Sequence, residues 1–275
     1  MSTNKNPFFT IVVPAYNCQA FILETIASVE QQTFKDWELI VVEDHSRDNT
    51  LQVVQEYIAD KQKMRLVQTE KNSGSPGRPR DVGVQFANGQ FIGFLDGDDQ
   101  YAPEKLERHY QAIQRKKDIE FIHTSCDIIS EKGQFLHHQP LKWFLKLYMW
   151  LFPMRSVCIL SNPFNISTTV IKKDIITNYP FASPAQIVTA VEDWFNWNKI
   201  MSDFLPVIHY DKMPLTKYRL VENSISGRNV HRCEFQAISF FSILLSERKI
   251  SIFEWYVGTF IRLMRIFFKK FLGYR

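Results

Sequence analysis

Phe91-Ile92-Gly93-Phe94-Leu95-Asp96-Gly97-Asp98-Asp99 is the most informative segment of the sequence, because an apolar strand ends there abruptly in three carboxylates. The run from Phe91 to Leu95 lacks polar alternation, which is typical of a buried central strand in an α/β sheet. Such sheets bind ligands just beyond the carboxyl ends of their strands. Carboxylates on a short loop suit Mg²⁺ or Mn²⁺ held together with substrate phosphates. The stretch therefore predicts a metal–diphosphate site, with an acidic solvent-facing turn as the alternative.

Strand-like and helix-like segments alternate through the first hundred residues. We expect strands over residues 9–13, 37–42, 64–68 and 91–95, and helices over residues 21–31, 49–60 and 81–87. Alternating elements of this kind predict a mostly parallel sheet flanked by helices, with right-handed crossovers.

The composition is that of an enzyme-sized globular protein. The chain has 275 residues, 45% of them hydrophobic, and a formal net charge of +4. Its four cysteines lie far apart without a CxxC pair, which predicts reduced thiols in a cytosolic setting rather than a zinc cluster or a disulfide framework. The polar N-terminus leads straight into the first strand, so we expect no signal peptide.

Polar residues follow several of the predicted strands and should meet on one edge of the sheet. Tyr16 follows the first strand, Asp44 follows the second, and the Gly/Pro segment 72–80 ends in Arg80. Tyr16 could stack on a base, Asp44 could accept a base N–H, and Arg80 could meet a phosphate. The alternative is that these segments are simple connectors. The chain contains neither a Walker A loop nor a GxGxxG motif.

The order and spacing of the motifs through about residue 110 resemble those of family 2 glycosyltransferases. The motifs are Val-Val-Pro-Ala-Tyr-Asn (12–17), Glu-Thr-Ile-Ala-Ser-Val (24–29), Gln-Thr (32–33), Trp-Glu-Leu-Ile-Val-Val-Glu-Asp (37–44) and Phe-Leu-Asp-Gly-Asp-Asp (94–99). The resemblance implies a GT-A fold, which is a Rossmann-like α/β fold, and inversion at the anomeric carbon.

The resemblance also implies roles for individual residues. Pro14, Tyr16 and Asp44 would line the base and ribose pocket, and Asp96 and Asp98 would hold a divalent cation, Mn²⁺ or Mg²⁺, and the diphosphate. Arg80 would take the place of the arginine in the family's Ala-Arg-Asn triplet. The chain departs from the family where it has Glu43-Asp44-His45-Ser46 in place of Asp-Asp-Gly-Ser, and Pro79-Arg80-Asp81 in place of that triplet.

The second half of the chain carries a further acidic pair. Glu192-Asp193 resembles the family's Glu-Asp pair at a helix start, which makes Asp193 the candidate catalytic base and Glu192 its support; the alternative is an acidic first helical turn that interacts with the helix dipole. The segment 217–226 resembles the family segment after the last core strand, and its Arg219 is either structural or a phosphate ligand. We expect residues 1–110 to bind the nucleotide sugar, residues 111–245 to hold the acceptor and the base, and residues 246–275 to form a tail.

The tail is basic and has helical periodicity. Residues 246–275 carry seven Lys or Arg and two Glu, a formal charge of +5. Apolar residues recur every three or four positions from Phe253 to Leu272, and we expect Arg262, Arg265 and Lys269 on the opposite side. This pattern predicts a terminal amphipathic helix on an anionic membrane surface, with a helix packed on the catalytic domain as the alternative. The aromatic segment 141–153 is too short and too charged to span a bilayer, and predicts a core helix or an acceptor-site lid.

Together these features predict a glycosyltransferase that moves a sugar from a nucleotide sugar, with UDP favoured, to a hydroxyl of a glycan or lipid-linked glycan. We expect it to act in bacterial surface-polysaccharide synthesis (O-antigen, capsule, exopolysaccharide or lipooligosaccharide), at the cytoplasmic face of the inner membrane and without nucleic acid as a partner. A nucleotidyltransferase that releases diphosphate, and a non-catalytic relative of the same fold, are the alternatives.

Overall fold

The computed structural model describes residues 6–139, 154–182, 189–221 and 230–272. By packing, the chain forms two units. The sheet unit comprises Met1–Pro140, Asn165–Pro180 and Pro206–Leu220, and the helical unit comprises Leu141–Phe164, Phe181–Leu205 and Val221–Arg275. The functional division at residues 110 and 245 remains a prediction. The aromatic segment 141–153 lies outside the described residues.

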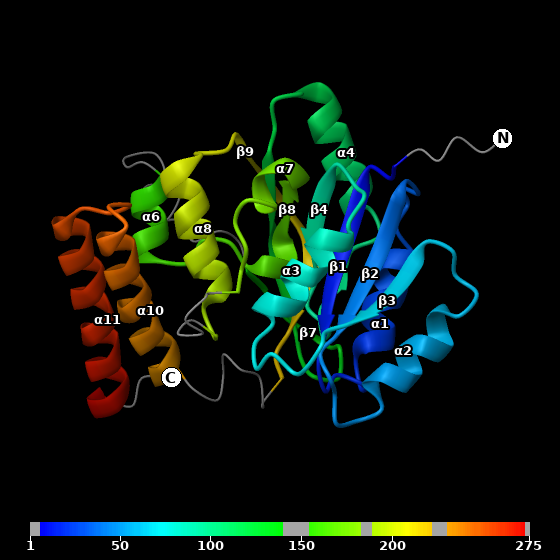
Figure 1. The fold of residues 1–275 in the computed structure, drawn as a ribbon, viewed down its shortest axis with the longest axis horizontal. Coiled ribbons are helices and arrows are strands. Elements are labelled where there is room, and N and C mark those ends of the chain that lie inside the picture. Colours follow the sequence, from blue (N-terminus) through cyan, green and yellow to red (C-terminus); the bar gives the residue numbers. More distant parts are fainter. Residues whose placement is uncertain (1–5, 140–153, 183–188, 222–229, 273–275) are drawn as a thin grey trace. The chain divides into compact units, whose positions relative to one another are not determined.

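The sheet unit is built on one twisted sheet, in the strand order β3-β2-β1-β4-β8-β6-β9-β5, with β7 paired to β6 (Figure 1). The first four strands in this order are mutually parallel, as the sequence predicted. Next to them, β8 runs antiparallel to both β4 and β6, whereas β9 runs parallel to β6. The strands are β1 (Phe9–Ala15), β2 (Trp37–Glu43), β3 (Met64–Gln68), β4 (Phe91–Phe94), β5 (Gln100–Tyr101), β6 (Phe121–Ile129), β7 (Phe135–Gln139), β8 (Thr169–Lys172) and β9 (Ile208–Arg219).

Helices pack on the two faces of the parallel part of this sheet. Alternate β1 residues, such as Ile11 and Val13, share a buried apolar cluster with α1 (Ile22–Glu30), α2 (Thr50–Ile58) and α4 (Lys105–Arg115). Val12 points to the other face, where α3 (Gly77–Phe86) lies against it. A Cβ on Gly83 would lie 2.3 Å from a Val12 methyl carbon, so only glycine allows α3 to approach β1 so closely. The sheet unit also contains the short helices η1 (Ile166–Thr168) and α7 (Lys173–Ile176).

Helix α3 begins four residues earlier than the sequence predicted, at Gly77 instead of Asp81. The Gly/Pro segment 72–80, which contains Pro79, was expected to lead into the helix and not to form part of it. Pro79 lies in the first turn, however, where backbone N–H groups have no intrahelical acceptor, so its missing N–H costs nothing there. As a result Arg80 projects from a helix and not from a loop.

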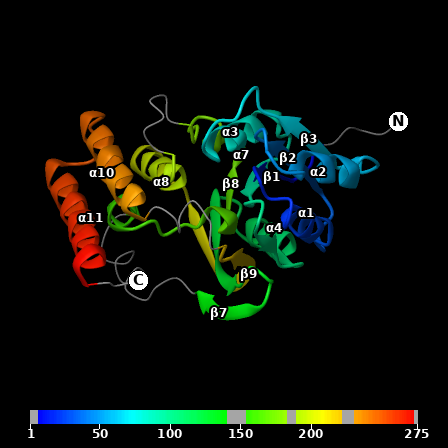
Figure 2. The same cartoon turned by 90° about the horizontal axis from the view of Figure 1, so that it is seen from below.

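In the described residues of the helical unit, the helices are α6 (Met154–Leu160), α8 (Glu192–Asp203), α10 (Val230–Ser246) and α11 (Ile252–Leu272) (Figures 1 and 2). Its core joins Ile159 and Trp194 to the α10 phenylalanines Phe240 and Phe241. Gly258 of α11 packs against this core, because a Cβ there would lie 2.8 Å from the Phe241 ring. No helix in the described part of the chain is long and apolar enough to cross a membrane.

The sequence predicted that Arg262 lies on the exposed polar face of the last helix, and this prediction is wrong. Its side chain is only 2% exposed, and it is paired with Glu234 and stacked over Trp194. Several large apolar side chains of α11 instead point outward, namely Ile252, Phe253, Tyr256, Phe260, Leu263, Phe267 and Phe268. The periodicity identified a helix with two different faces. The buried face, however, is the one that carries Arg262, because a carboxylate and an indole are there to receive its guanidinium.

Candidate active site

The acidic loop after β4, residues 96–99, is held as a tight turn at the end of the parallel strands. The Asp99 amide donates to the Asp96 carbonyl oxygen over 3.0 Å. A Cβ on Gly97 would lie 3.0 Å from the Cys18 sulfur and 3.2 Å from the Pro14 carbonyl oxygen, so glycine lets the loop pack against the end of β1 without displacing these atoms. The short apolar strand and the glycine together bring the carboxylates to the strand end that the sequence predicted.

Arg219, the last residue of β9, stabilises this loop through several hydrogen bonds. Its backbone N–H donates to Asp99 Oδ1 at 2.9 Å, and its Nε donates to the Asp98 carbonyl oxygen at 2.8 Å. Its other two guanidinium nitrogens donate to the Glu131 carbonyl oxygen and to Glu24 Oε2. The side chain is 1% exposed. Of the two roles that the sequence left open for Arg219, this arrangement favours the structural one.

The loop concentrates negative charge in a poorly solvated place. Burial, followed by the charge of Asp96, raises the pKa of Asp98 to about 7. Burial also raises the pKa of Asp99, helped by the charges of Asp98 and Asp96 and opposed by a hydrogen bond from Ser167. Carboxyl groups whose pKa is raised in this way have too little positive charge nearby to stabilise their ionised form. This is the electrostatic setting that a bound cation would relieve.

Arg80 supplies positive charge to the same loop from the side of α3. Its Nη2 lies 2.7 Å from Asp96 Oδ1, and its side chain is 2% exposed whereas that of Asp96 is 30% exposed. The earlier start of α3 makes this contact possible. Arg80 therefore reaches Asp96 directly, and Asp96 keeps an accessible side.

Tyr16 and Pro14 lie where β1 ends. Pro14 is still inside the strand and pairs with Val42, whereas Tyr16 is 42% exposed. Reciprocal hydrogen bonds fix the loop that carries Tyr16 against the loop after β2: the Asn17 amide donates to Ser46 Oγ, and the Arg47 amide donates to Asn17 Oδ1. An exposed aromatic ring on a fixed loop at the carboxyl edge of the sheet is available to stack on a planar group.

Asp44 is buried at the end of β2 and binds the chain segment that follows β3. Its carboxylate accepts hydrogen bonds from the Thr69 hydroxyl at 2.7 Å, the Ser73 hydroxyl at 2.8 Å and the Ser73 amide. The Asn72 amide group donates to the Asp44 carbonyl oxygen. Asp44 thus fixes the conformation of the loop over residues 69–75. A nucleotide base that bound here would meet a carboxylate that already accepts hydrogen bonds from Thr69 and Ser73.

The acidic pair of the second half begins α8 in the helical unit. Asp193 is half-buried; its Oδ1 accepts from the Trp194 amide at 2.6 Å, and its Oδ2 accepts from the Asn162 side chain at 3.0 Å. Glu192 is buried, at 4% exposed. Of the pair, Asp193 is therefore the more accessible carboxylate, as a base that meets a substrate must be.

Three residues that the sequence did not single out support these groups. Ser167 Oγ accepts a hydrogen bond from the Asp96 amide at 3.1 Å, and the fully buried Lys105 holds the Ser167 and Thr168 carbonyl oxygens. Asn162 binds Asp193 as described above. No local motif marks these positions, because each acts through a partner more than 30 residues away in the chain.

The residues present fit a divalent cation that is shared with a substrate. Among the described residues, no group of three or more His, Cys, Asp or Glu side chains converges as a metal cage. Mg²⁺ is commonly bound by one or two carboxylates together with substrate phosphates and water, so Asp96 and Asp98 form an adequate donor set. A single cation coordinated by both would also offset the charge that raises the pKa of Asp98.

Curated proteins similar to this chain are glycosyltransferases by name. The Escherichia coli protein WfgD, named a UDP-Glc:α-D-GlcNAc-diphosphoundecaprenol β-1,3-glucosyltransferase, is 29% identical over 221 residues, which cover 79% of each chain. TarS of Staphylococcus aureus, a poly(ribitol-phosphate) β-N-acetylglucosaminyltransferase, is 41% identical over 101 residues, which cover 36% of this chain and 18% of TarS. The chain spans about half, or less, of the length of several of the curated relatives it matches.

Solved structures share the fold. Residues 1–349 of TarS in complex with UDP superpose with a TM-score of 0.61 at 21% identity, over 85% of this chain and 65% of that one. The mannosyltransferase PcManGT of Pyrobaculum calidifontis, in complex with GDP-Man and Mn²⁺, superposes with a TM-score of 0.64 at 15% identity, over 88% of this chain and 65% of that one. These likenesses confirm the GT-A fold that the motifs predicted.

A sequence model of one family, described as glycosyl transferase family 2, matches residues 10–173, which is more than half of the chain and includes the acidic loop and Ser167. The chain belongs to glycosyl transferase family 2.

Proposed function

We propose that the protein is an inverting glycosyltransferase that moves a sugar from a nucleotide sugar, preferably a UDP-sugar, to a hydroxyl of a glycan or lipid-linked glycan acceptor. The observation that carries the proposal is the acidic loop after β4, where Asp96 and Asp98 lie at the carboxyl end of the sheet and Arg80 is bound to Asp96. This loop lies within the region that the family model matches. The names of the relatives support bacterial surface-polysaccharide synthesis as the setting.

The donor would lie along the strand ends of the sheet unit. Tyr16 would stack on the base, with Pro14 shaping the same pocket, and Asp44 would face the base or ribose through the loop that it organises. A divalent cation on Asp96 and Asp98, when bound, would stabilise the negative charge of the departing diphosphate. Arg80 orients Asp96 for that task, and Arg219 holds the loop in place.

Asp193 would act as the general base. Its two carboxylate oxygens are oriented by hydrogen bonds from Asn162 and Trp194, so the carboxylate has a fixed direction from which to take the proton of an acceptor hydroxyl. Glu192, which is buried and precedes Asp193 in the chain, would support that geometry. Attack on the face opposite the leaving diphosphate inverts the anomeric centre, and no covalent intermediate is needed.

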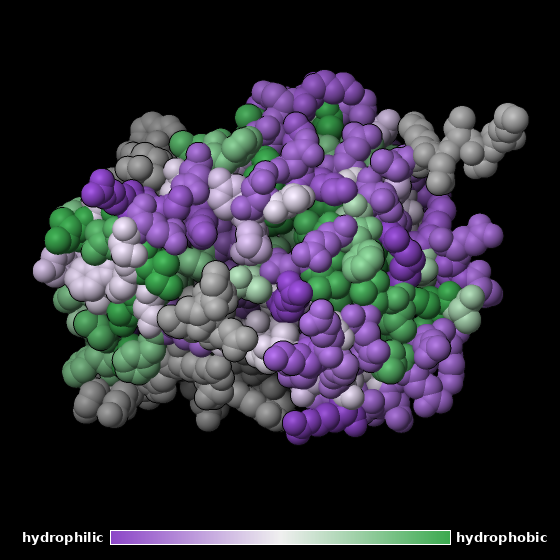
Figure 3. All heavy atoms as spheres, in the orientation of Figure 1, coloured by the Kyte–Doolittle hydropathy of each residue, from purple (hydrophilic) through white to green (hydrophobic). Residues whose placement is uncertain are grey.

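The exposed face of α11 supports a peripheral place on the cytoplasmic face of the inner membrane. Figure 3 shows hydrophobic residues gathered on the left of the view, where Figure 1 draws α10 and α11. Phe253 is 73% exposed and Phe260 64% exposed, on the same side of one helix. An apolar stripe with basic residues at its end is typical of helices that lie in a membrane interface.

The test is a transfer assay with products resolved. The name of WfgD suggests UDP-Glc as the first donor to try and a GlcNAc-diphosphate lipid as the first acceptor, and the TarS structure with UDP-GlcNAc suggests the second donor. With Mn²⁺ present, a glycosyltransferase releases UDP and forms a new glycosidic bond. Release of inorganic diphosphate would point to a nucleotidyltransferase, and no turnover with any donor and acceptor pair would favour a non-catalytic relative.

A further inference from the structure

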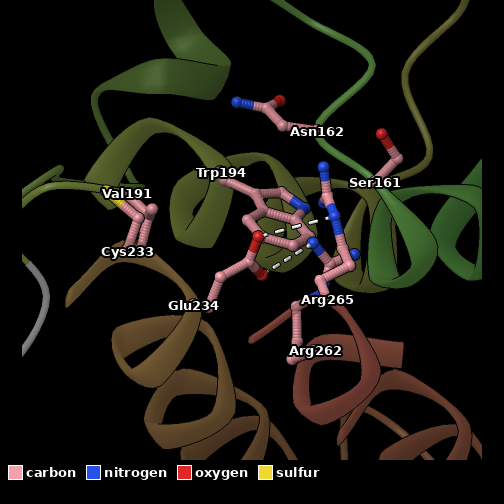
Figure 4. Close-up of a pocket in the computed structure, with 8 residues that line it drawn as sticks. All are labelled: Ser161, Asn162, Val191, Trp194, Cys233, Glu234, Arg262 and Arg265. Carbon is pink, nitrogen blue, oxygen red and sulfur yellow. Dashed lines mark hydrogen bonds and ion pairs between the residues drawn. The ribbon is translucent and has the colours of Figure 1, made fainter. Parts of the chain in front are cut away.

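The helical unit contains a small, half-open cavity of about 220 Å³, which we call the arginine pocket (Figure 4). Each helix in the described part of this unit contributes to the lining, either directly or through residues next to its end. The lining consists of Ser161, Asn162, Val191, Trp194, Cys233, Glu234, Arg262 and Arg265. Pockets that enclose a whole ligand usually measure about 300–1,000 Å³. The arginine pocket is therefore the size for one group of a larger molecule.

The charges of the side chains that line this pocket do not sum to zero. Glu234 lies between two arginines, with Oε2 3.3 Å from Arg262 Nη1 and Oε1 3.5 Å from Arg265 Nε. One carboxylate neutralises one guanidinium, so the charged groups of the lining sum to +1. Arg265 is 51% exposed whereas Glu234 is 8% exposed, so the accessible charge is the positive one.

The pocket holds one of its guanidinium groups in a fixed orientation. The Arg262 Cζ atom lies 4.5 Å from the centre of the Trp194 ring, and the indole nitrogen of Trp194 is itself bound to the Cys158 carbonyl oxygen. A planar guanidinium fixed by stacking and by a carboxylate is well suited to recognise an oxyanion, because less side-chain entropy is lost when the anion binds.

Two residues connect this pocket to the proposed base. Asn162 and Trp194 both line it, and both donate hydrogen bonds to the Asp193 carboxylate. These two donors partly compensate the negative charge of Asp193, which does not itself line the pocket. A molecule with one group in the pocket thus contacts the residues that orient Asp193, which is where an acceptor must bring its hydroxyl.

We propose that the arginine pocket binds an oxyanion of the acceptor, a phosphate or a carboxylate, and so positions the acceptor at Asp193. The inference rests on the proposed function for the role of Asp193 and adds the chemical class of the acceptor. Arg265 is the residue that meets the anion from the open side, and Arg262 and Trp194 form the fixed wall.

The test uses three probes of similar size that differ in charge: phenyl phosphate, benzoate and benzyl alcohol. Each is titrated calorimetrically into the intact protein with Mg²⁺ and saturating UDP, so that the proposed donor site is filled. We expect saturable binding of at least one anion and none of the alcohol. The anion that binds more tightly identifies the acceptor group.

Arg265→Gln is the decisive variant, because Arg265 is half-exposed and its loss leaves Glu234 paired with Arg262. It should weaken binding of that anion by at least about tenfold, the effect of one charge-assisted hydrogen bond. Arg248→Gln is the matched control, since Arg248 is exposed in the same unit and does not line the pocket. Thermal melts of both variants should match that of the wild type.

Equal anion affinity in the two variants would overturn the inference, as would the absence of saturable anion binding in the wild type or equally tight binding of benzyl alcohol. UDP binding is measured in the same samples. If the wild type binds UDP but not the anions, only the arginine pocket proposal fails. If the wild type does not bind UDP at all, the proposed function itself is contradicted.

Discussion

At the scale of single residues, the acidic loop depends on a serine far away in the chain. Ser167 accepts a hydrogen bond from the Asp96 amide and bonds to the Asp99 carboxyl group, so it fixes both ends of the loop. It is fully buried, and Lys105 holds its carbonyl oxygen in turn. The direction of the Asp96 and Asp98 side chains is thus set by residues that would not touch the substrate.

Ser167→Ala should therefore loosen the acidic loop without unfolding the sheet unit. One lost buried hydrogen bond is typically worth about 0.5–1.5 kcal/mol, so we expect Mn²⁺-dependent affinity for UDP to fall by about two- to tenfold. Titration calorimetry measures this. Ser130→Ala removes a hydroxyl from the β6–β7 turn of the same unit and serves as the control. An unchanged affinity in Ser167→Ala would exclude a positioning role for this serine.

Asp193→Asn tests the base. Asparagine preserves the size of the side chain and can still accept a hydrogen bond from Asn162, but it cannot take up a proton. Transfer should fall by about 10²–10⁴, which is the usual contribution of general-base catalysis. UDP binding should be unchanged. Loss of UDP binding to the same extent as transfer would place Asp193 in the donor site and refute its assignment as the base.

At the scale of elements, α4 and β6 carry imidazoles that the fold keeps neutral. Burial, followed by the charges of His209 and Lys105, lowers the pKa of His123 to about 3. Burial also lowers the pKa of His109 on α4, and neither His109 ring nitrogen has a hydrogen-bond partner among the described residues. Since unfolded histidine titrates near pH 6.5, the unfolded chain binds more protons than the folded one below that pH.

The free energy of unfolding should therefore fall as the pH is lowered through about 6.5. Each buried imidazole contributes up to about 1.4 kcal/mol per pH unit to that slope. His109→Leu removes one of them, so its stability should depend less steeply on pH between about 4 and 6.5. Urea unfolding at several pH values measures the slope. His137→Gln, at an exposed site on β7, is the control and should keep the wild-type slope. A slope that is the same in all three proteins would show that His109 is not held neutral.

The elements also show what the sequence could and could not predict. Buried strands such as β4 were predicted to within one residue, because a buried parallel strand is a continuous apolar run bounded by polar turns. The start of α3 was missed because Pro79 is compatible with a first helical turn, which composition cannot distinguish from a loop. The burial of Arg262 was missed because it depends on Glu234 and Trp194, which are distant in sequence and come close only in the folded unit.

The same distinction holds for the candidate site. The acidic loop was predicted in place because its residues are consecutive and end a strand. The roles of Ser167 and Asn162 could not be predicted, because a single serine or asparagine carries no signal until the residue that it binds is known.

At the scale of the whole molecule, proposed contact with a membrane depends on the apolar residues of α11 more than on its charges. Of the basic residues expected on the side opposite the apolar face, Arg262 is buried, so reversing its charge would test stability and not membrane binding. The exposed phenylalanines are the informative targets. They contribute little to the stability of the helical unit, because their side chains are already exposed to solvent.

The intact protein should float with phosphatidylglycerol vesicles, and the double variant Phe253→Ser and Phe260→Ser should float at least about tenfold less. Burying one phenylalanine is worth about 1.5–3 kcal/mol when complete, so even partial insertion of two gives this effect. Phe86→Ser with Phe135→Ser removes two similarly exposed rings from the sheet unit and should leave flotation unchanged. Wild-type protein that stays in the bottom fraction, or an equal loss in both double variants, would rule out the α11 face as a membrane contact.

We expect the acidic loop after β4 to bind a nucleoside diphosphate together with a divalent cation. Calorimetric titration of UDP into wild type, Asp98→Asn and Asp118→Asn, each with Mn²⁺ and with EDTA, tests it most directly; Asp118 is a surface control at 62% exposed. We predict saturable binding with Mn²⁺ in the wild type and the control, and its loss in EDTA and in Asp98→Asn, whose thermal stability is unchanged. UDP binding that is equal with Mn²⁺ and EDTA, or that survives in Asp98→Asn, would contradict the account.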